Sequence, residues 1–294
     1  MEFRSRQSYA CAVANSAELQ PGDTLGAYRL EAFLGEGAMG VVFRAQREHD
    51  GREVALKVLK RELEGDAVFQ QRLRHEARAA AEVQSPHLVS IVEADAADGR
   101  HYLAVEFVGG GSLAARIASA DRLALTDALR IVSDVACGLD ALNSAGLVHR
   151  DVKPSNILFD AEGAALLTDF GLAKGSSYTV LTQPGQVIGT LDYLAPELIR
   201  GEPATPVSDV YALGCVSFEC VTGRTPFADK GLFQIGLAHL EESPPDPASL
   251  RPDLPGRLSV ALLTALEKEP ERRPPSAGAY ASLLRAASKE AALA

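Results

Sequence analysis

Five short motifs follow one another in a fixed order between residues 35 and 197. They are GEGAMG at 35–40, VALK at 54–57, HRDVKPSN at 149–156, DFG at 169–171 and APE at 195–197. Each motif is short enough to occur by chance, but their joint order is not. Together they contain the parts that a phosphoryl-transfer site needs: a glycine-rich loop, a lysine, an acid–base aspartate and oxygen ligands for a cation. The order therefore constrains the chain to a fold that brings these segments to one site.

Composition narrows the classes of protein that fit. The chain has 294 residues, enough for one large domain or two lobes, and its 47% hydrophobic and 23% charged content is ordinary for a globular enzyme. The net charge of −10 disfavours nucleic acid or an anionic membrane as a partner. The four cysteines form no C-x-x-C pair, and no apolar run approaches the roughly 18 residues of a membrane helix. We expect a cytoplasmic protein without a membrane span.

The residue pattern changes near three consecutive glycines at 109–111. Before them, alternating β-rich runs at 28–34, 41–45, 53–59, 88–94 and 101–107 surround one helical stretch at about 66–83. After them, helical patterns dominate, at about 126–144, 207–221, 232–241, 257–267 and 277–287. The predicted fold class is α+β, with a small five-stranded antiparallel β lobe carrying one helix and a larger, mainly helical lobe. A ligand cleft is expected between the lobes.

These patterns also predict the domain boundaries. Residues 1–25 are expected to form a flexible N-terminal leader, 26–107 the small lobe, 108–287 the large lobe and 288–294 a C-terminal tail. Residues 26–287 would then form one domain.

The glycine-rich motif is weak evidence alone, and the residues after it decide its meaning. In a dinucleotide-binding unit the third glycine opens a helix. Here Gly40 opens the β-branched run VVFRA, so the loop is predicted to bend between two antiparallel strands. Glycines in such a loop let backbone N–H groups approach phosphates closely. The alternative is a glycine-rich hairpin that binds nothing.

Lys57 ends an apolar strand and needs an anionic partner there, because an unpaired buried ammonium is costly. Glu76, on the following helix, is the expected partner. Lys57 would contact the α- and β-phosphates of a nucleotide, and Glu76 would orient it. The alternative is a lysine on an edge strand whose ammonium extends into water.

The motif HRDVKPSN is the most specific of the set. Asp151 can accept the proton of an attacking hydroxyl, and Lys153 can neutralise charge on the transferring phosphoryl group. Asn156 supplies a neutral oxygen ligand for a cation such as Mg²⁺. The runs ILF and ALLTDFG predict a hairpin that returns Asp169, the main carboxylate ligand, to Asn156. Taken singly, either aspartate could be an ordinary turn residue.

The assembled motifs resemble the protein kinase family over about residues 28–284, and most closely the eukaryotic-like serine/threonine kinases of bacteria. The segments RHEARAAAEVQSPHLV, TDFGLAK, VIGTLDYLAPE and DVYALGCVSFECVTGRTPF carry this resemblance. It implies transfer of the γ-phosphate of ATP, with Mg²⁺ or Mn²⁺, to Ser or Thr of protein substrates. Lys153 and Thr190 mark Ser/Thr rather than Tyr specificity in this family.

The resemblance also implies a set of nucleotide contacts. Val42, Ala55 and Leu158 would sandwich the adenine, Glu106 to Val108 would form the hinge that hydrogen-bonds the base, and Val105 would border the back of the pocket. The full set of expected ATP-binding residues is Leu34, Gly35, Glu36, Gly37, Ala38, Met39, Gly40, Val41, Val42, Ala55, Lys57, Val105, Glu106, Val108 and Leu158.

Two structural roles follow from the same resemblance. Asp209 would brace the catalytic loop, and Glu197 would form an ion pair with Arg273.

The resemblance also implies regulation: Arg150 precedes the catalytic aspartate, and in this family an arginine there pairs with a phosphorylated activation loop. Thr182 is the predicted main autophosphorylation site, although it could be an ordinary loop threonine. Pro184 stands where close relatives often carry a second phosphorylated threonine. Proteins that recognise phosphothreonine and a second copy of the chain are further expected partners.

Three alternatives stay open at this stage. A pseudokinase scaffold would bind nucleotide without transfer, but Lys57, Asp151, Asn156 and Asp169 are all intact. A small-molecule phosphotransferase of related fold would generally lack the loop GTLDYLAPE, which docks a polypeptide. A Rossmann-type oxidoreductase is disfavoured by the strand after Gly40.

Overall fold

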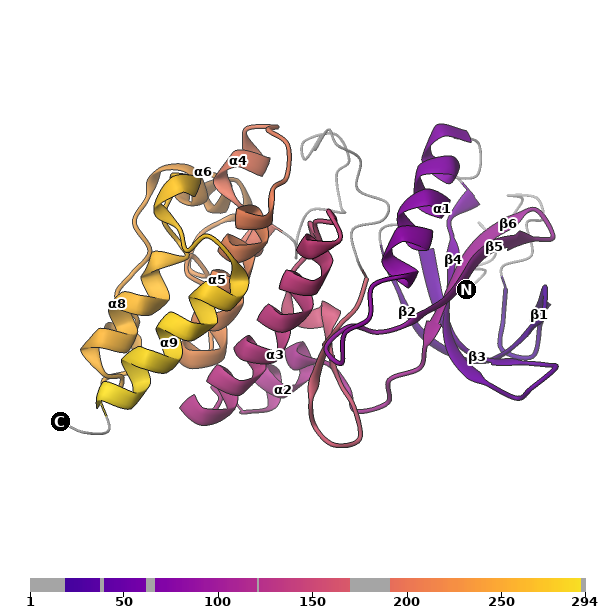
Figure 1. Cartoon of the computed structure of the whole chain (residues 1–294), viewed down its shortest axis with the longest axis horizontal. Coiled ribbons are helices and arrows are strands. Elements are labelled where there is room, and N and C mark those ends of the chain that lie inside the picture. The colour runs from indigo at the N-terminus through magenta and orange to yellow at the C-terminus, as the bar shows by residue number, and fades with distance from the viewer. Residues whose placement is uncertain (1–18, 38–39, 62–66, 121, 170–190, 292–294) are drawn as a thin grey trace, which may run out of the picture.

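The computed structural model describes residues 19–37, 40–61, 67–120, 122–169 and 191–291. These residues form a lobe dominated by a β-sheet, at the right of Figure 1, and a larger helical lobe at the left. The predicted α+β, two-lobed architecture is confirmed. Within the described residues, no helix is both long enough and apolar enough to cross a membrane.

The small lobe is built on one antiparallel sheet with strand order β1-β2-β3-β4-β6-β5. The strands are β1 (Thr24–Leu25), β2 (Tyr28–Glu36), β3 (Gly40–Arg47), β4 (Glu53–Leu59), β5 (Ile91–Ala97) and β6 (Arg100–Glu106). Helix α1 (Ala67–Ala81) packs on the sheet, with Leu73, Ala77 and Ala80 contributing to a shared apolar cluster. The sheet encloses its own core around Tyr28, Phe43 and Leu56.

The sheet has six strands where five were predicted, because β1 adds a short strand at the edge. Gly26 adopts a left-handed backbone (φ 57°) that returns the chain, so that Leu25 pairs with Tyr28. Leu25 is buried in the small-lobe core. Strand β1 therefore lies inside the range expected for the leader. Two residues are too few to show the alternation by which strands are predicted.

The large lobe is mainly helical. Its longer helices are α2 (Leu113–Ala120), α3 (Leu125–Ser144), α5 (Pro206–Thr222), α6 (Leu232–Glu241), α8 (Gly256–Thr264) and α9 (Ala277–Ala291). Two short helices, α4 (Pro196–Ile199) and α7 (Pro247–Leu250), and a hairpin of β7 (Ile157–Phe159) and β8 (Ala165–Leu167) complete it. Helix α5 is apolar on nearly every side and buried along most of its length, as expected for a helix surrounded by others.

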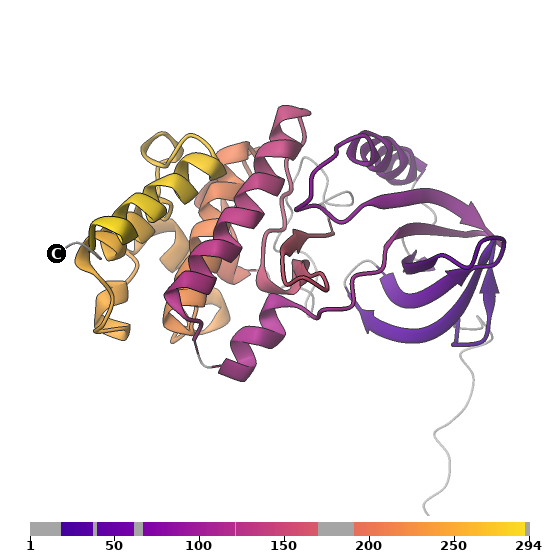
Figure 2. The ribbon, with the colours of Figure 1, turned by 60° about the horizontal axis from the view of Figure 1, so that its bottom comes forward.

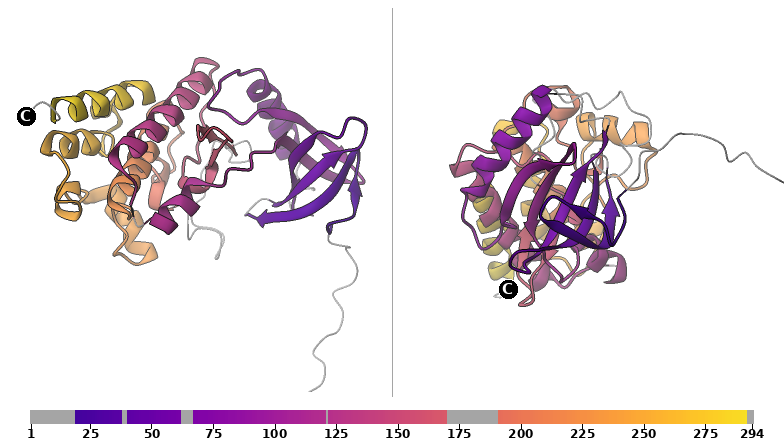
Figure 3. Two further views of the ribbon diagram at one scale, coloured as in Figure 1. Left: turned by 90° about the horizontal axis from the view of Figure 1, so that it is seen from below. Right: turned by 90° about the vertical axis from the view of Figure 1, so that its right-hand side faces the viewer.

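The two lobes are joined by tight backbone contacts as well as by the chain itself. In the linker after β6, Gly110 N–H donates to the Phe159 carbonyl at 3.0 Å, and a Cβ on Gly110 would lie only 2.2 Å from that oxygen. On the other side, Leu167 N–H of β8 donates to the His87 carbonyl at 2.9 Å. Figures 2 and 3 show the hairpin of β7 and β8 beside this junction.

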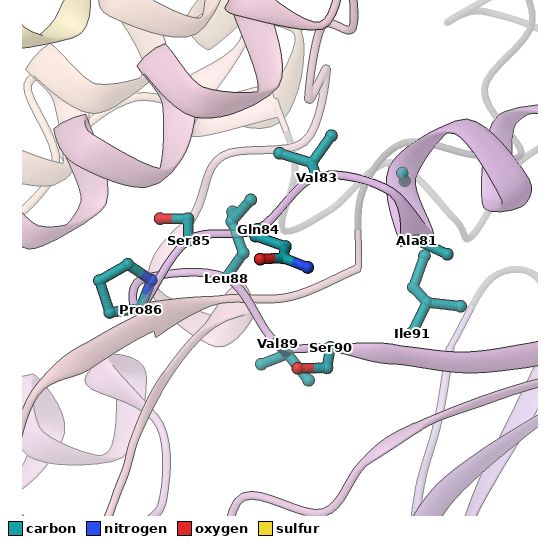
Figure 4. A pocket seen from close by; sticks show the side chains of 10 residues that line it. Ala81, Val83, Gln84, Ser85, Pro86, Leu88, Val89, Ser90 and Ile91 are labelled. Carbon is teal, nitrogen blue, oxygen red and sulfur yellow. The ribbon is translucent and has the colours of Figure 1, made fainter.

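A pocket of about 500 Å³ opens beside the segment that connects α1 to β5. Figure 4 shows the side chains of Val83, Gln84, Leu88 and Ile91 around it. It contains none of the predicted site residues.

Candidate active site

The glycine-rich loop joins β2 to β3, as predicted. Gly35 pairs with Val42, and Gly37 N–H donates to the Gly40 carbonyl at 2.8 Å to close the turn. Ala38 and Met39 lie outside the described residues. The loop is therefore a β-hairpin and not the start of a helix.

The glycines of this loop serve different purposes. A Cβ on Gly40 would lie 2.1 Å from the Val58 carbonyl oxygen, so sheet packing demands glycine there. At Gly35, no atom lies within 4 Å of the position that a Cβ would occupy. Packing does not require glycine at 35, and the backbone there is open to a ligand, as a phosphate-binding loop needs.

The side chains expected to hold the adenine come from both lobes. Val42 lies on β3, Ala55 on β4 and Leu158 on β7, and each is half-buried. On β4 the buried residues Val54 and Leu56 alternate with Ala55 and Lys57, so the latter two share the face opposite the small-lobe core. The structure thus places Ala55 and Lys57 on one face of one strand.

The remaining expected contacts divide into several groups. Val105 pairs with Ala55, and Glu106 ends β6, where its N–H donates to the Ser90 carbonyl at 2.9 Å. Val108 lies two residues after the end of β6, Glu36 is the last residue of β2, and Leu34 is exposed. Val41 packs against the small-lobe core, so its side chain lies on the opposite face of β3 from Val42. Because residues alternate along a strand, only the backbone of Val41 shares the face of Val42, and its assignment as a nucleotide contact stays a prediction.

The expected ion pair between Lys57 and Glu76 is wrong. Lys57 Nζ lies 2.9 Å from Asp169 Oδ1, and Glu76 Oε1 instead lies 3.4 Å from an Arg150 guanidinium nitrogen. Two ion pairs thus join segments that lie far apart in the sequence. The position of α1 relative to the catalytic loop decides the pairing, and no sequence pattern reports that position.

The catalytic loop surrounds Asp151 with polar partners. Asp151 Oδ2 lies 2.9 Å from Lys153 Nζ and accepts a hydrogen bond from Asn156 Nδ2 at 3.0 Å. Asn156 Nδ2 also donates to the Asp151 carbonyl at 2.9 Å. The carboxylate is therefore oriented by two neighbours from its own motif, as a proton acceptor needs to be.

His149 links the two motifs of the site, a role that sequence reasoning missed. Its ring is fully buried, Nδ1 accepts from Asp151 N–H at 3.2 Å, and Nε2 donates to the Thr168 carbonyl at 3.0 Å. The ring thereby connects the residue before Asp169 to the catalytic loop. The spacing of HRDVKPSN contains no signal for this long-range bond.

Asp209 braces the same loop, as predicted. Its carboxylate accepts from His149 N–H at 2.7 Å and from Arg150 N–H at 2.9 Å. Burial raises the pKa of Asp209 to about 7, against the opposing effect of these two N–H groups. Arg150 itself has a left-handed backbone (φ 65°), a strained conformation that this brace helps to hold.

Glu197 and Arg273 form the predicted ion pair below the loop. Two guanidinium nitrogens each lie 2.8 Å from a Glu197 oxygen, and Ser208 Oγ donates to the same carboxylate at 2.7 Å. Burial would raise the pKa of Glu197, but Arg273 and Ser208 hold it below its usual value. The pair joins α4 to the segment before α9, and Ser208 and the Val207 carbonyl of α5 bond to its two members.

The predicted cation ligands lie on adjacent segments. Thr168 N–H donates to the Asn156 carbonyl at 2.9 Å, so the hairpin returns Asp169 to the catalytic loop as expected. The Asn156 amide nitrogen faces Asp151, and its oxygen accepts only a long, 3.5 Å hydrogen bond from Ser155 Oγ, so it keeps a lone pair for a cation. Within the described residues, no cluster of three or more His, Cys, Asp or Glu could hold a metal alone. Two oxygen ligands plus substrate phosphates fit the way Mg²⁺ is usually bound.

The regulatory residues are only partly described. Arg150 contacts Glu76 and belongs to the braced loop. Thr182 and Thr190 lie outside the described residues.

Comparison with known proteins gives one consistent result. Residues 28–277 match the protein kinase domain family. The serine/threonine-protein kinase PknE of Mycobacterium tuberculosis is 40% identical over 258 residues, which are 88% of this chain and 45% of the relative. PknA of the same organism is 40% identical over 266 residues, which are 89% of this chain and 61% of the relative. The chain thus spans about half the length of these relatives.

A comparison with solved structures also finds a kinase domain. The crystal structure of the Mycobacterium tuberculosis PknI kinase domain is 30% identical, with a TM-score of 0.74, and the match covers 92% of this chain and 100% of that domain.

Proposed function

Because this chain belongs to the protein kinase domain family, we propose that it transfers the γ-phosphate of ATP to Ser or Thr hydroxyl groups of proteins. Protein substrates and its own activation loop are the proposed acceptors. The family match over residues 28–277 supports the proposal that residues 26–287 form one domain. Phosphothreonine-recognising partners, a homodimer and a cytoplasmic location stay predictions from the sequence.

The orientation of Asp151 is the observation that carries this proposal. Its Oδ2 is held by Lys153 and Asn156 at 2.9 and 3.0 Å, and the loop is anchored to buried Asp209. In the reaction, the acceptor hydroxyl oxygen bonds to the γ-phosphorus, the bond from that phosphorus to the β–γ bridging oxygen breaks, and the hydroxyl proton passes to Asp151. Lys153 would neutralise charge on the group in transfer.

Asn156 and Asp169 would hold the divalent cation that the family requires. When bound, such a cation neutralises phosphate charge and orients the phosphates. Lys57 would supply a further positive charge at the phosphates, and its 2.9 Å contact with Asp169 supports this role. We propose Mg²⁺, with Mn²⁺ as an alternative.

Incubation of the purified chain with radiolabelled ATP tests the proposal. Wild type is expected to label itself and a general protein acceptor such as casein or myelin basic protein, on Ser and Thr. Asp151→Asn should reduce the rate by about 10²–10⁴, the usual contribution of a general base. Asp229→Asn, which removes an exposed carboxylate from the same lobe, should leave the rate unchanged.

Two results would contradict the proposal. Binding of ATP without transfer by wild type would favour a scaffold, and transfer to an antibiotic but not to proteins would favour a small-molecule phosphotransferase. For the activation loop, we propose Thr182 as the main site, and phosphopeptide mapping that finds Thr182 unmodified in fully active protein would exclude it.

A further inference from the structure

Lys268 lies in the large lobe between α8 and α9, and its side chain reaches to the end of α6. Its Nζ donates to the Ala238 carbonyl at 3.1 Å, in the last turn of that helix. The same carbonyl accepts the N–H of Glu242, the residue after the helix, at 3.0 Å. Carbonyl oxygens at the C-terminal end of a helix carry partial negative charge, so an ammonium group is stabilising there. Lys268 therefore provides a cationic cap for α6.

Two aromatic rings face the Lys268 ammonium. Its Nζ lies 5.0 Å from the centroid of the Phe227 ring and 5.9 Å from that of the Tyr211 ring, and both rings are buried. Burial lowers the pKa of Lys268 to about 8, so keeping the cation at this place costs free energy. The helix-end carbonyl and the two ring faces offset this cost. The ammonium thus joins α5, α6 and the segment between them.

The backbone of Lys268 is attached to the buried ion pair of Glu197 and Arg273. Arg273 Nη2 donates to the Lys268 carbonyl at 2.9 Å, and Arg273 Nε donates to the Glu267 carbonyl at 2.8 Å. The Arg273 side chain is fully buried. The backbone end of Lys268 is therefore anchored by the ion pair, while its ammonium end bonds to α6.

Helix α6 packs on a segment that borders the catalytic loop. It contacts α4, beside it in Figure 1, and the 3₁₀ turn Leu191–Tyr193. Leu191 of this turn and Ile235 of α6 belong to one apolar cluster. Tyr193, at the end of the turn, lines a small cavity that Asp151 also borders. Because close-packed interiors transmit displacements, a shift of α6 would move the turn next to the proposed proton acceptor.

We propose that Lys268 is a positioning residue for the protein acceptor: it holds the C-terminal end of α6 and thereby keeps the turn Leu191–Tyr193 in place beside Asp151. The inference rests on the proposed kinase function. The turn belongs to the loop GTLDYLAPE, which is expected to dock the polypeptide. Loss of the cation should therefore weaken acceptor binding and leave nucleotide binding unchanged.

Steady-state kinetics of Lys268→Met test this inference. Methionine keeps an unbranched side chain but removes the charge and the hydrogen-bond donor. We expect the KM for casein or myelin basic protein, whichever wild type labels, to rise roughly tenfold, as for the loss of one hydrogen bond from a charged group. The KM for ATP should stay at the wild-type value. A variant that only folds less well would lower the apparent kcat and leave both KM values unchanged.

A conservative variant and a matched control separate the cation from packing. Lys268→Arg restores a cation with donors, so it should keep most of the wild-type affinity for the acceptor. Lys230→Met removes another lysine at the end of α6, one that forms an ion pair with half-exposed Glu242 at 2.8 Å, and should change neither KM. An acceptor KM that Lys268→Arg does not restore would place the effect in packing and overturn the inference.

Hydrogen exchange measured by mass spectrometry examines α6 directly. In Lys268→Met the amides of α6 should exchange faster than in wild type, while those of α9 should not. If the methionine variant does not fold, Lys268→Gln, which keeps a donor without the charge, replaces it in both measurements.

Two further outcomes distinguish this inference from the proposed function. If the folded variant keeps the wild-type acceptor KM, or if its α6 amides exchange as in wild type, the inference is overturned while the kinase function stands. If wild type binds ATP but phosphorylates no protein, the proposed function is wrong and the inference fails with it.

Discussion

The large lobe and the junction between the lobes hold their charged side chains in different ways. In the large lobe, Arg273 and Glu197 pair through two hydrogen bonds with side chains 0% and 4% exposed. At the junction, Lys57 and Asp169 make one contact with side chains 21% and 38% exposed. The pair of Arg150 and Glu76 is similar, at 23% and 19%.

This difference separates a rigid platform from an adjustable junction. Breaking a buried, doubly bonded pair leaves a charge in a low-dielectric interior, whereas water replaces much of an exposed contact. The catalytic loop is anchored to the platform through the two backbone N–H groups that donate to Asp209. Four variants test this contrast through the free energy of unfolding.

The largest effect is expected from Glu197→Ala. The change leaves the Arg273 guanidinium buried without its carboxylate and should reduce the free energy of unfolding by about 3–5 kcal/mol. Urea denaturation measures it. Glu202→Ala, at an exposed position nearby, serves as the control and should change little. If Glu197→Ala reduced the free energy of unfolding by less than about 1 kcal/mol, the large lobe would not be the rigid platform described above.

Gly110→Ala tests whether the backbone of the junction is tightly packed, although the ion pairs of the junction are partly exposed. The new Cβ would lie 2.2 Å from the Phe159 carbonyl, so the linker must shift, at a cost of about 1–3 kcal/mol. Gly35→Ala, with no atom within 4 Å, is the matched control. Equal unfolding free energies for both variants would show that the linker backbone can shift to accommodate the new Cβ without loss of stability.

Asp209→Asn should change how stability depends on pH. Its pKa rises from 3.8 to about 7 through burial, so the unfolded chain releases this proton first as pH increases. The stabilisation from Asp209 is complete below pH about 4 and is lost as pH rises through 7, by about 2 kcal/mol between pH 5.5 and 8. The variant should lack this decline, as urea denaturation at both pH values would reveal. Parallel pH profiles for wild type and variant would mean that Asp209 ionises normally.

The smallest effect on stability is expected from Lys57→Met. The Lys57–Asp169 contact is partly exposed, so its loss should cost no more than about 1 kcal/mol. Phosphoryl transfer should nevertheless be lost, because the phosphates lose a charge. Lys230→Met, which removes a lysine paired with half-exposed Glu242 in the large lobe, should leave both stability and activity intact. If Lys57→Met reduced the free energy of unfolding by several kcal/mol, the distinction between a rigid platform and an adjustable junction would be wrong.

Much of the site could be predicted because its chemistry is local in the chain. Asp151, Lys153 and Asn156 lie within six residues, and the rigid loop lets them contact one another directly. The hairpin that returns Asp169 is also short. The brace by Asp209 and the Glu197–Arg273 pair join distant segments, and only the family resemblance made them predictable.

Other features depend on positions that no short pattern records. Glu76 was paired with Lys57 in the prediction, yet it contacts Arg150. Strand β1 was too short to show a period, and Val41 proved to belong to the core.

The sequence by itself determined the fold class, the order of the motifs and the side chains available for proton transfer and cation binding. These features depend on the spacing of apolar residues and on residue type, and both can be read directly from the sequence. The tertiary structure alone decided which carboxylate each cation meets and which residues share a pocket. The physical reason is that an ion pair depends on separation and burial, and both are set by how the lobes and helices pack.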